Sequence, residues 1–193
     1  MRNNINLILE SAVEIELKNA YENIFEQYRL WTTNGINESN LTHQFSEAMR
    51  KSLKDDKSFV CFEQALKEKR KRIDGIVYSP AQESIFFVES KRFKRSQPKY
   101  EDSLDRDIER ILEDDNRNSI LKNLKSDKKQ IKQYCVFIAD HWKLNNSQER
   151  VEKWFSKHIE TNKYIRIYYK SFTCEGVDSN EKYMIFAMVL KIK

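Results

Sequence analysis

Two segments, Arg72–Tyr78 (RIDGIVY) and Ile85–Lys91 (IFFVESK), decide the fold predicted for this chain. Both segments are rich in β-branched and aromatic residues, which favour strands, and Ser79–Glu83 between them contains a proline and reads as a turn. We therefore expect an antiparallel hairpin. Both alternating faces of the second segment are apolar before its acid, which is typical of a central strand covered on two sides.

The hairpin carries three charged residues that can meet. Side chains alternate along a strand, so Glu89 and Lys91 share one face and Ser90 has the other. Pairing of the strands brings Asp74 beside them. Two carboxylates next to an ammonium are costly to assemble unless a divalent cation binds there. The candidate ligands are Asp74, Glu89 and the backbone carbonyl of Ser90, and the plain alternative is a surface ion pair at a sheet edge.

Asp74 and the Glu89-x-Lys91 pair at this spacing resemble the PD-(D/E)xK nuclease superfamily, also called the restriction-endonuclease-like fold. The likeness covers roughly Glu38 to Asp140, and Ile73 stands where the superfamily has its proline. It implies a metal-dependent endodeoxyribonuclease of restriction, defence or repair type, with RNA not excluded as substrate. Mg²⁺ would be the cofactor, with Mn²⁺ as a substitute. Lys91 would position or activate the attacking water.

A third acid from the helix before the first strand is often added in that superfamily, and three glutamates compete for the role. The expected helix has an apolar stripe, namely Leu41, Phe45, Ala48, Met49 and Ser52. At roughly 100° per residue, Glu38 falls on this stripe and Glu47 on the opposite face. Glu63 is in phase with apolar neighbours on a strand. We expect Glu38 to face the sheet, and all three alternatives stay open.

Basic clusters flank the acidic motif on both sides. Net charge is only +5, but Lys67–Arg72 and Lys91–Arg95 bracket the hairpin, and 122–132 adds a third basic stretch. A phosphodiester substrate needs cations that offset repulsion from the acids. The predicted nucleic-acid contacts are Lys69, Arg70, Lys71, Arg92 and Lys94. Solvated surface charge is the alternative for each cluster.

The composition fits one nuclease-like domain over residues 1–193. This length can bury a sizeable core, and only three glycines and two prolines leave little room for linkers. Three widely spaced cysteines indicate a reducing interior, and the chain has no apolar run long enough for a bilayer. We expect a cytoplasmic protein with no membrane partner. Dimerisation through the helix at 7–31 would supply two sites for cutting two strands.

The expected fold class is α/β, with a central mixed sheet and helices on both faces. Helices are expected at 7–31, from Ser39 or Asn40 to Leu53, at 100–124 with a break near Asp114, and at 148–159. The strands are expected at 59–66, 72–78, 85–91, 134–139, 164–172 and 182–192. The order within the core is α-β-β-β-α-β, with an N-terminal helix and C-terminal strands added.

A second function remains open for the same fold. A catalytically inactive nucleic-acid-binding or regulatory protein would share the basic clusters and the sheet. The presence of Asp74, Glu89 and Lys91 counts against it, because a site that has lost its activity has no need of all three.

Overall fold

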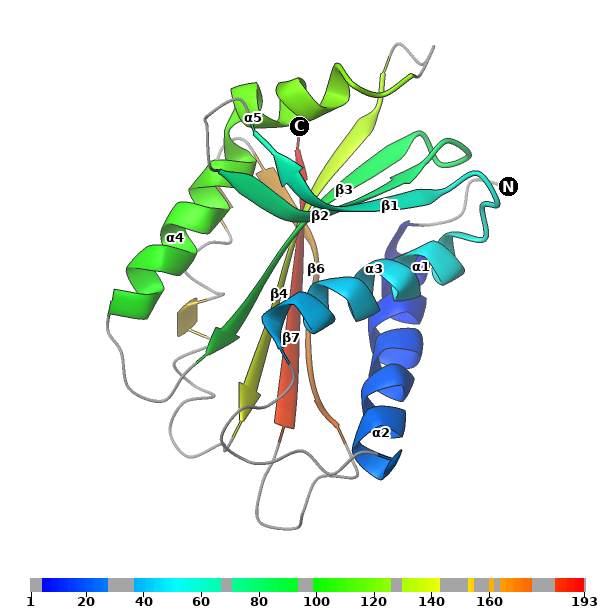
Figure 1. The fold of residues 1–193 in the computed structure, drawn as a ribbon, viewed down its shortest axis with the longest axis vertical. Helices are drawn as coiled ribbons and strands as arrows, with labels where there is room; N and C mark the ends of the chain where they lie inside the picture. The colour runs from blue at the N-terminus through cyan, green and yellow to red at the C-terminus, as the bar shows by residue number, and fades with distance from the viewer. Residues whose placement is uncertain are drawn as a thin grey trace.

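The computed structural model describes residues 5–27, 37–66, 71–93, 99–125, 130–142, 153–154, 160–161, 164–174 and 183–192. These residues form an α/β fold around one mixed sheet (Figure 1). In that part of the chain, no helix is both long and apolar enough to cross a membrane.

The sheet has seven strands in the order β1-β2-β3-β4-β7-β6-β5. Their bounds are β1 Phe59–Ala65, β2 Arg72–Ser79, β3 Ser84–Phe93, β4 Lys132–Trp142, β5 Glu160–Thr161, β6 Tyr164–Cys174 and β7 Tyr183–Ile192. Neighbouring strands are antiparallel except β3 and β4, which run parallel. A parallel pair needs a crossover connection, and the helices between β3 and β4 provide it.

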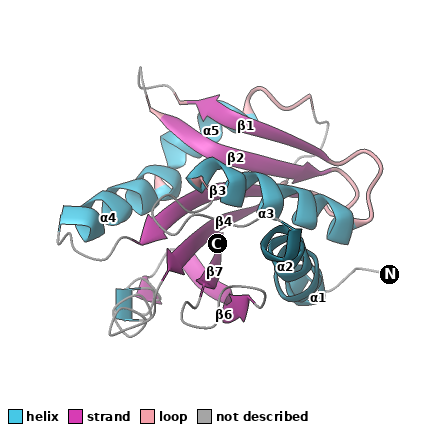
Figure 2. Cartoon of the chain, turned by 60° about the horizontal axis from the view of Figure 1, so that its bottom comes forward, coloured by secondary structure: helices cyan, strands magenta, loops and turns pink. Residues whose placement is uncertain are grey.

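Helices cover both faces of the sheet (Figure 2). One face packs against a continuous N-terminal helix, made of α1 (Ile5–Glu10), a π-helical stretch η1 (Ser11–Leu17) and α2 (Lys18–Gln27), and against α3 (Glu38–Leu53). The other face packs against α4 (Lys99–Leu112) and α5 (Asp114–Leu121). The expected mixed sheet between two helical layers is confirmed, with α3, β1, β2, β3, α4–α5 and β4 in the predicted order.

Most predicted elements lie where the periodicity placed them. The helix after the motif breaks at Glu113, next to the predicted Asp114. α3 begins at Glu38, one residue before the predicted start near Ser39 or Asn40, because Asn37 is the N-cap and its side chain accepts a hydrogen bond from the Ser39 N–H. Most of the helix predicted at 148–159, and residues 28–31, lie outside the described residues.

The hairpin register brings the two motif strands together as expected. Gly75 pairs with Val88 and Tyr78 with Ile85, so Asp74 falls opposite Glu89, one step beyond the last pair. Gly75 is also where α3 approaches the sheet. A Cβ at this position would lie 3.0 Å from Thr42 Cγ2 and 3.5 Å from Ser46 Oγ. The missing side chain therefore lets α3 sit against β2 and β3.

Gly75→Ala should lower the free energy of unfolding by about 1–3 kcal/mol, in the range of overpacked cores. Thr42 cannot easily move aside, because its buried hydroxyl contacts the Ser90 hydroxyl. Adding Thr42→Ser removes the obstructing methyl group and keeps a hydroxyl, so the double variant should recover stability in urea unfolding. Equal losses in the single and double variants would contradict the close-approach explanation.

Candidate functional site

Asp74 lies where β2 and β3 separate. Its Oδ2 accepts a hydrogen bond of 2.9 Å from the Ser90 N–H, and the Ser90 hydroxyl lies 3.3 Å from the same oxygen. The carboxylate thus takes a backbone N–H that a continuing ladder would give to a carbonyl of β2. Ser90 Oγ also lies 3.2 Å from the carbonyl oxygen of Glu38, so α3 is tied to this point of the sheet.

Glu89 is the buried acid of the site. Its residue is 2 % exposed, and Oε1 accepts a hydrogen bond of 2.6 Å from Arg110 Nη2 on α4. Among the described residues, Oε2 has no hydrogen-bond partner. A buried carboxylate oxygen without a partner is costly, so Glu89 is an unusual group for the interior of a sheet.

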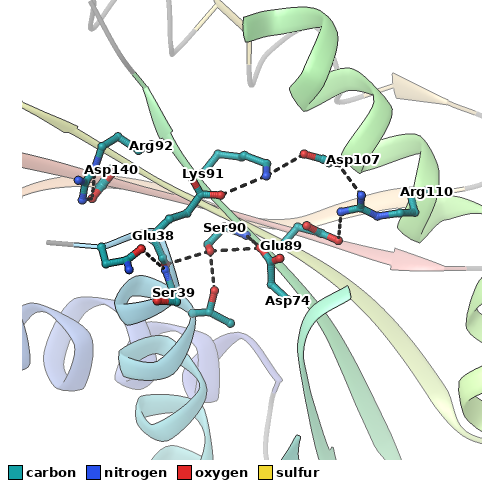
Figure 3. A network of polar contacts seen from close by, with 12 residues as sticks. Glu38, Ser39, Asp74, Glu89, Ser90, Lys91, Arg92, Asp107, Arg110 and Asp140 are labelled. Atoms are coloured by element: carbon teal, nitrogen blue, oxygen red, sulfur yellow. Dashed lines mark hydrogen bonds and ion pairs between the residues drawn. The ribbon is translucent and has the colours of Figure 1, made fainter. Parts of the chain in front are cut away.

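Lys91 lies between two acids from opposite helical layers. Its Nζ is 3.1 Å from Glu38 Oε1 on α3 and 2.9 Å from Asp107 Oδ2 on α4. Asp107 Oδ1 is in turn 2.8 Å from Arg110 Nη1. Figure 3 shows this chain of ion pairs, which runs from Glu38 through Lys91, Asp107 and Arg110 to Glu89.

The surroundings raise the pKa of both Glu89 and Lys91, which disfavours the charged form of the acid and favours the charged form of the lysine. Burial, followed by the nearby charge of Asp74, raises the pKa of Glu89 well above its usual value, although Arg110 opposes the shift. Burial alone would lower the pKa of Lys91, but the hydrogen bond to Asp107 and the charge of Glu38 outweigh it and raise the pKa. Without a further cation the site therefore disfavours the charged form of Glu89 and favours the charged form of Lys91.

Asp74 and Glu89 fit a divalent cation by their chemistry. Mg²⁺ prefers oxygen ligands and is held in proteins by one or two carboxylates with several waters. Oε2 of Glu89, which has no partner among the described residues, is an oxygen that could serve as a ligand beside Asp74. In the described part of the chain, no three or more His, Cys, Asp or Glu side chains are grouped closely enough to hold a metal ion. The two acids and the Ser90 carbonyl would have to suffice.

The three competing glutamates lie in different places. Glu38 contacts Lys91, and Glu47 forms a 2.9 Å ion pair with Arg50 on the far side of α3, so the predicted helix phase is confirmed for both. Glu63 departs from its expected apolar face. Its backbone is left-handed, with φ of 53°, and its side chain is exposed beside Arg72. Strand alternation does not hold through a left-handed residue.

The predicted nucleic-acid contacts are only partly described. Lys71 is exposed at the start of β2. Arg92 forms a 2.8 Å ion pair with the buried Asp140, so its guanidinium is engaged within the fold. Lys69, Arg70 and Lys94 lie outside the described residues. A cavity of about 520 Å³ near α4 is lined by three cations, Lys71, Arg106 and Arg110, and by three acids, Asp107, Glu109 and Glu113.

Asp107 and Arg110 of α4 also belong to the site, although they were not among the residues predicted for it. The helical phase of α4 contained the information. Ile111 is fully buried, and at roughly 100° per residue Asp107 lies only about 40° from it around the helix. An acid so near the buried stripe must meet the sheet, where Lys91 is its partner.

Comparison of the chain with protein-family models, with curated proteins and with solved structures finds no match. The geometry of the described residues is therefore the basis for a functional proposal.

The ionisation of Glu89 predicts a stability that depends on pH when no divalent cation is present. A pKa raised in the folded state favours folding at pH below the unfolded value, and this contribution is lost as pH rises through the folded pKa. In EDTA, Glu89→Gln should match the wild type near pH 4.5, about the unfolded glutamate pKa. At higher pH the variant should become the more stable protein.

Thermal unfolding over a pH series checks this expectation, with Glu47→Gln as the control because Glu47 is half-buried and pairs with Arg50, away from the site. Parallel curves for wild type and Glu89→Gln at all pH values would show that burial does not perturb this carboxylate.

Proposed function

We propose that the protein is a metal-dependent nuclease that hydrolyses phosphodiester bonds, with DNA as its substrate. The observation that carries the proposal is the buried Glu89, with one oxygen unpartnered beside Asp74 and with Lys91 on the same strand. The strand order around these residues agrees with the restriction-endonuclease-like core that their spacing resembles. Free cysteines at 61, 135 and 174 support a reducing, cytoplasmic setting.

Asp74, Glu89 and the Ser90 carbonyl would hold Mg²⁺, or Mn²⁺ as its substitute. A bound divalent cation supplies a lower pKa for water and neutralises charge on the phosphate oxygens. The protein's own residues divide the remaining tasks. Glu89 would bind the cation from within the sheet, since it is buried in β3. Asp74 accepts a hydrogen bond from the Ser90 N–H and so holds the two strands together where their pairing ends.

Lys91 acts as a charged donor in this proposal. Because its pKa is raised, it keeps its protons at neutral pH and is unsuited to act as a general base. It would hold a phosphate oxygen or orient the attacking water. Glu38 and Asp107 position its ammonium from two sides. Lys71, Arg106 and Arg110 line the neighbouring cavity and would contact the backbone phosphates.

The second candidate is the inactive nucleic-acid-binding protein, and one observation favours it. Arg110 already neutralises Glu89 through a 2.6 Å ion pair, so the fold has a counter-charge of its own. Binding of a divalent cation separates the two candidates. A ligand that binds the folded state raises its melting temperature. The nuclease should show this rise with Mg²⁺, Mn²⁺ or Ca²⁺, and the inactive protein should not. A homodimer through the N-terminal helix, where Leu7 and Ile15 are exposed, remains a prediction.

Asp74→Asn and Glu89→Gln should each abolish cleavage of supercoiled, linear and single-stranded DNA in Mg²⁺. Each change removes a ligand and also relieves repulsion between two nearby carboxylates, so the fold should survive in EDTA. RNA substrates belong in the same assay. Cleavage that persists in EDTA, or in both variants, would contradict a metal site at these acids.

Glu38→Gln should reduce the cleavage rate about ten-fold or more, because small misplacements of a positioning group cost rates of this order. Glu38 Oε1 is 3.1 Å from the Lys91 ammonium, and a neutral amide holds it less firmly. Glu47→Gln is the matched control on the same helix, since Glu47 pairs with Arg50 instead. Equal rates for both variants would remove Glu38 from the site.

A further inference from the structure

A second cavity opens on the α3 side of Asp74, away from the basic residues of α4. Its volume is about 450 Å³, within the roughly 300–1,000 Å³ usual for small-molecule sites. Asp74, Ser90 and Glu38 are among the residues that line it. A group bound here would therefore adjoin the phosphate that the proposed nuclease cuts.

An aromatic pair also lines this cavity. Phe62 on β1 is 38 % exposed, and the His43 ring from α3 stacks on it, with centroids 5.4 Å apart and planes within 12°. Flat aromatic surfaces beside a nucleic-acid backbone are what unpaired bases stack on, at about 1–3 kcal/mol per base. Phe59 is similarly exposed on the same strand, but it packs against Tyr78 and is not among the residues that line the cavity.

Glu63 supplies a hydrogen-bond acceptor to the same cavity. Its left-handed backbone has no inserted residue to explain it, because Phe62 pairs with Gly75 and Gln64 with Ile73 in an unbroken register. Among the described residues, Glu63 forms an ion pair with Arg72 at 3.6 Å, and both side chains are 60 % exposed. Such exposed pairs are weak, so the carboxylate can exchange Arg72 for a ligand.

The hydrogen-bonding capacity of Glu63 determines which base the cavity can bind. A carboxylate only accepts hydrogen bonds, so it matches a base edge with adjacent donors. The Watson–Crick edge of guanine presents a ring N–H and an amino group side by side. Adenine and cytosine present one amino group beside an acceptor nitrogen, and thymine places its N–H between two carbonyl oxygens.

We propose that this cavity binds an unpaired guanine next to the scissile phosphate, stacked on the outer face of the ring pair formed by Phe62 and His43 and hydrogen-bonded to Glu63. The inference rests on the proposed nuclease function, which it extends to the preferred base. Because Phe62, His43 and Glu63 are distinct from the acids proposed to hold the metal, Asp74 and Glu89, base selection and cleavage can be tested separately.

The test measures binding of a fluorescent oligothymidylate that carries one guanine, in Ca²⁺ to prevent turnover. Replacing the guanine by hypoxanthine removes only the amino group. We expect the affinity to fall about ten-fold, because the Glu63 carboxylate then loses one of its two hydrogen-bond donors. Glu63→Gln should abolish this difference between the two oligonucleotides. Phe62→Leu should weaken binding of both about ten-fold, in line with loss of a stacked base.

Two control variants separate these effects from damage to the fold. Phe62→Tyr keeps the ring and should bind like the wild type, and Phe59→Leu removes an equally exposed ring outside the cavity and should also have no effect. Cleavage in Mg²⁺ is measured on the same oligonucleotides. Cleavage without discrimination between guanine and hypoxanthine would overturn the guanine site and leave the nuclease. Discrimination without cleavage would support the base site and overturn the nuclease. Absence of any binding would overturn both.

Discussion

The buried carboxylate of Glu89 is the constraint on which the rest of the site depends. It lies in β3, between two helical layers, and burial opposes its charge. Arg110 of α4 forms an ion pair with Glu89 and a second one with Asp107. Lys91 in turn contacts both Asp107 and Glu38, the latter on α3. The two helical layers are therefore linked to the sheet by charges as well as by apolar contacts. Such a partly satisfied network in a core is uncommon unless it has a task.

The two cavities beside the site differ in their linings. The cavity near α4 has three cations among three acids, whereas the residues that line the cavity on the Asp74 side include acids and aromatic rings but no lysine or arginine. A nucleotide combines an anionic phosphate with a flat base that carries donors. In the two proposals, cations near α4 contact the phosphate, and rings and acceptors on the Asp74 side contact the base. Neither proposal requires a separate recognition domain.

Much of this arrangement was predictable from local patterns. Strand alternation gave the relation of Glu89 to Lys91, and helical phase gave the inward position of Glu38 and the outward position of Glu47. Contacts made by tertiary structure were beyond such patterns. No spacing rule indicates that Arg92 meets Asp140, or that Arg110 reaches Glu89 across a crossover. The left-handed Glu63 was also beyond prediction, because nothing local distinguishes it from any other strand residue.

The position of Glu63 also matters for the outer edge of the sheet. Among the described strands β1 is terminal, and an exposed edge presents unpaired N–H and C=O groups to which another chain can add. A left-handed residue in its middle bends that row of groups away from the straight path a new strand needs. The same local distortion that turns a carboxylate toward the cavity would therefore discourage β1 of one molecule from pairing with β1 of another, and so oppose aggregation.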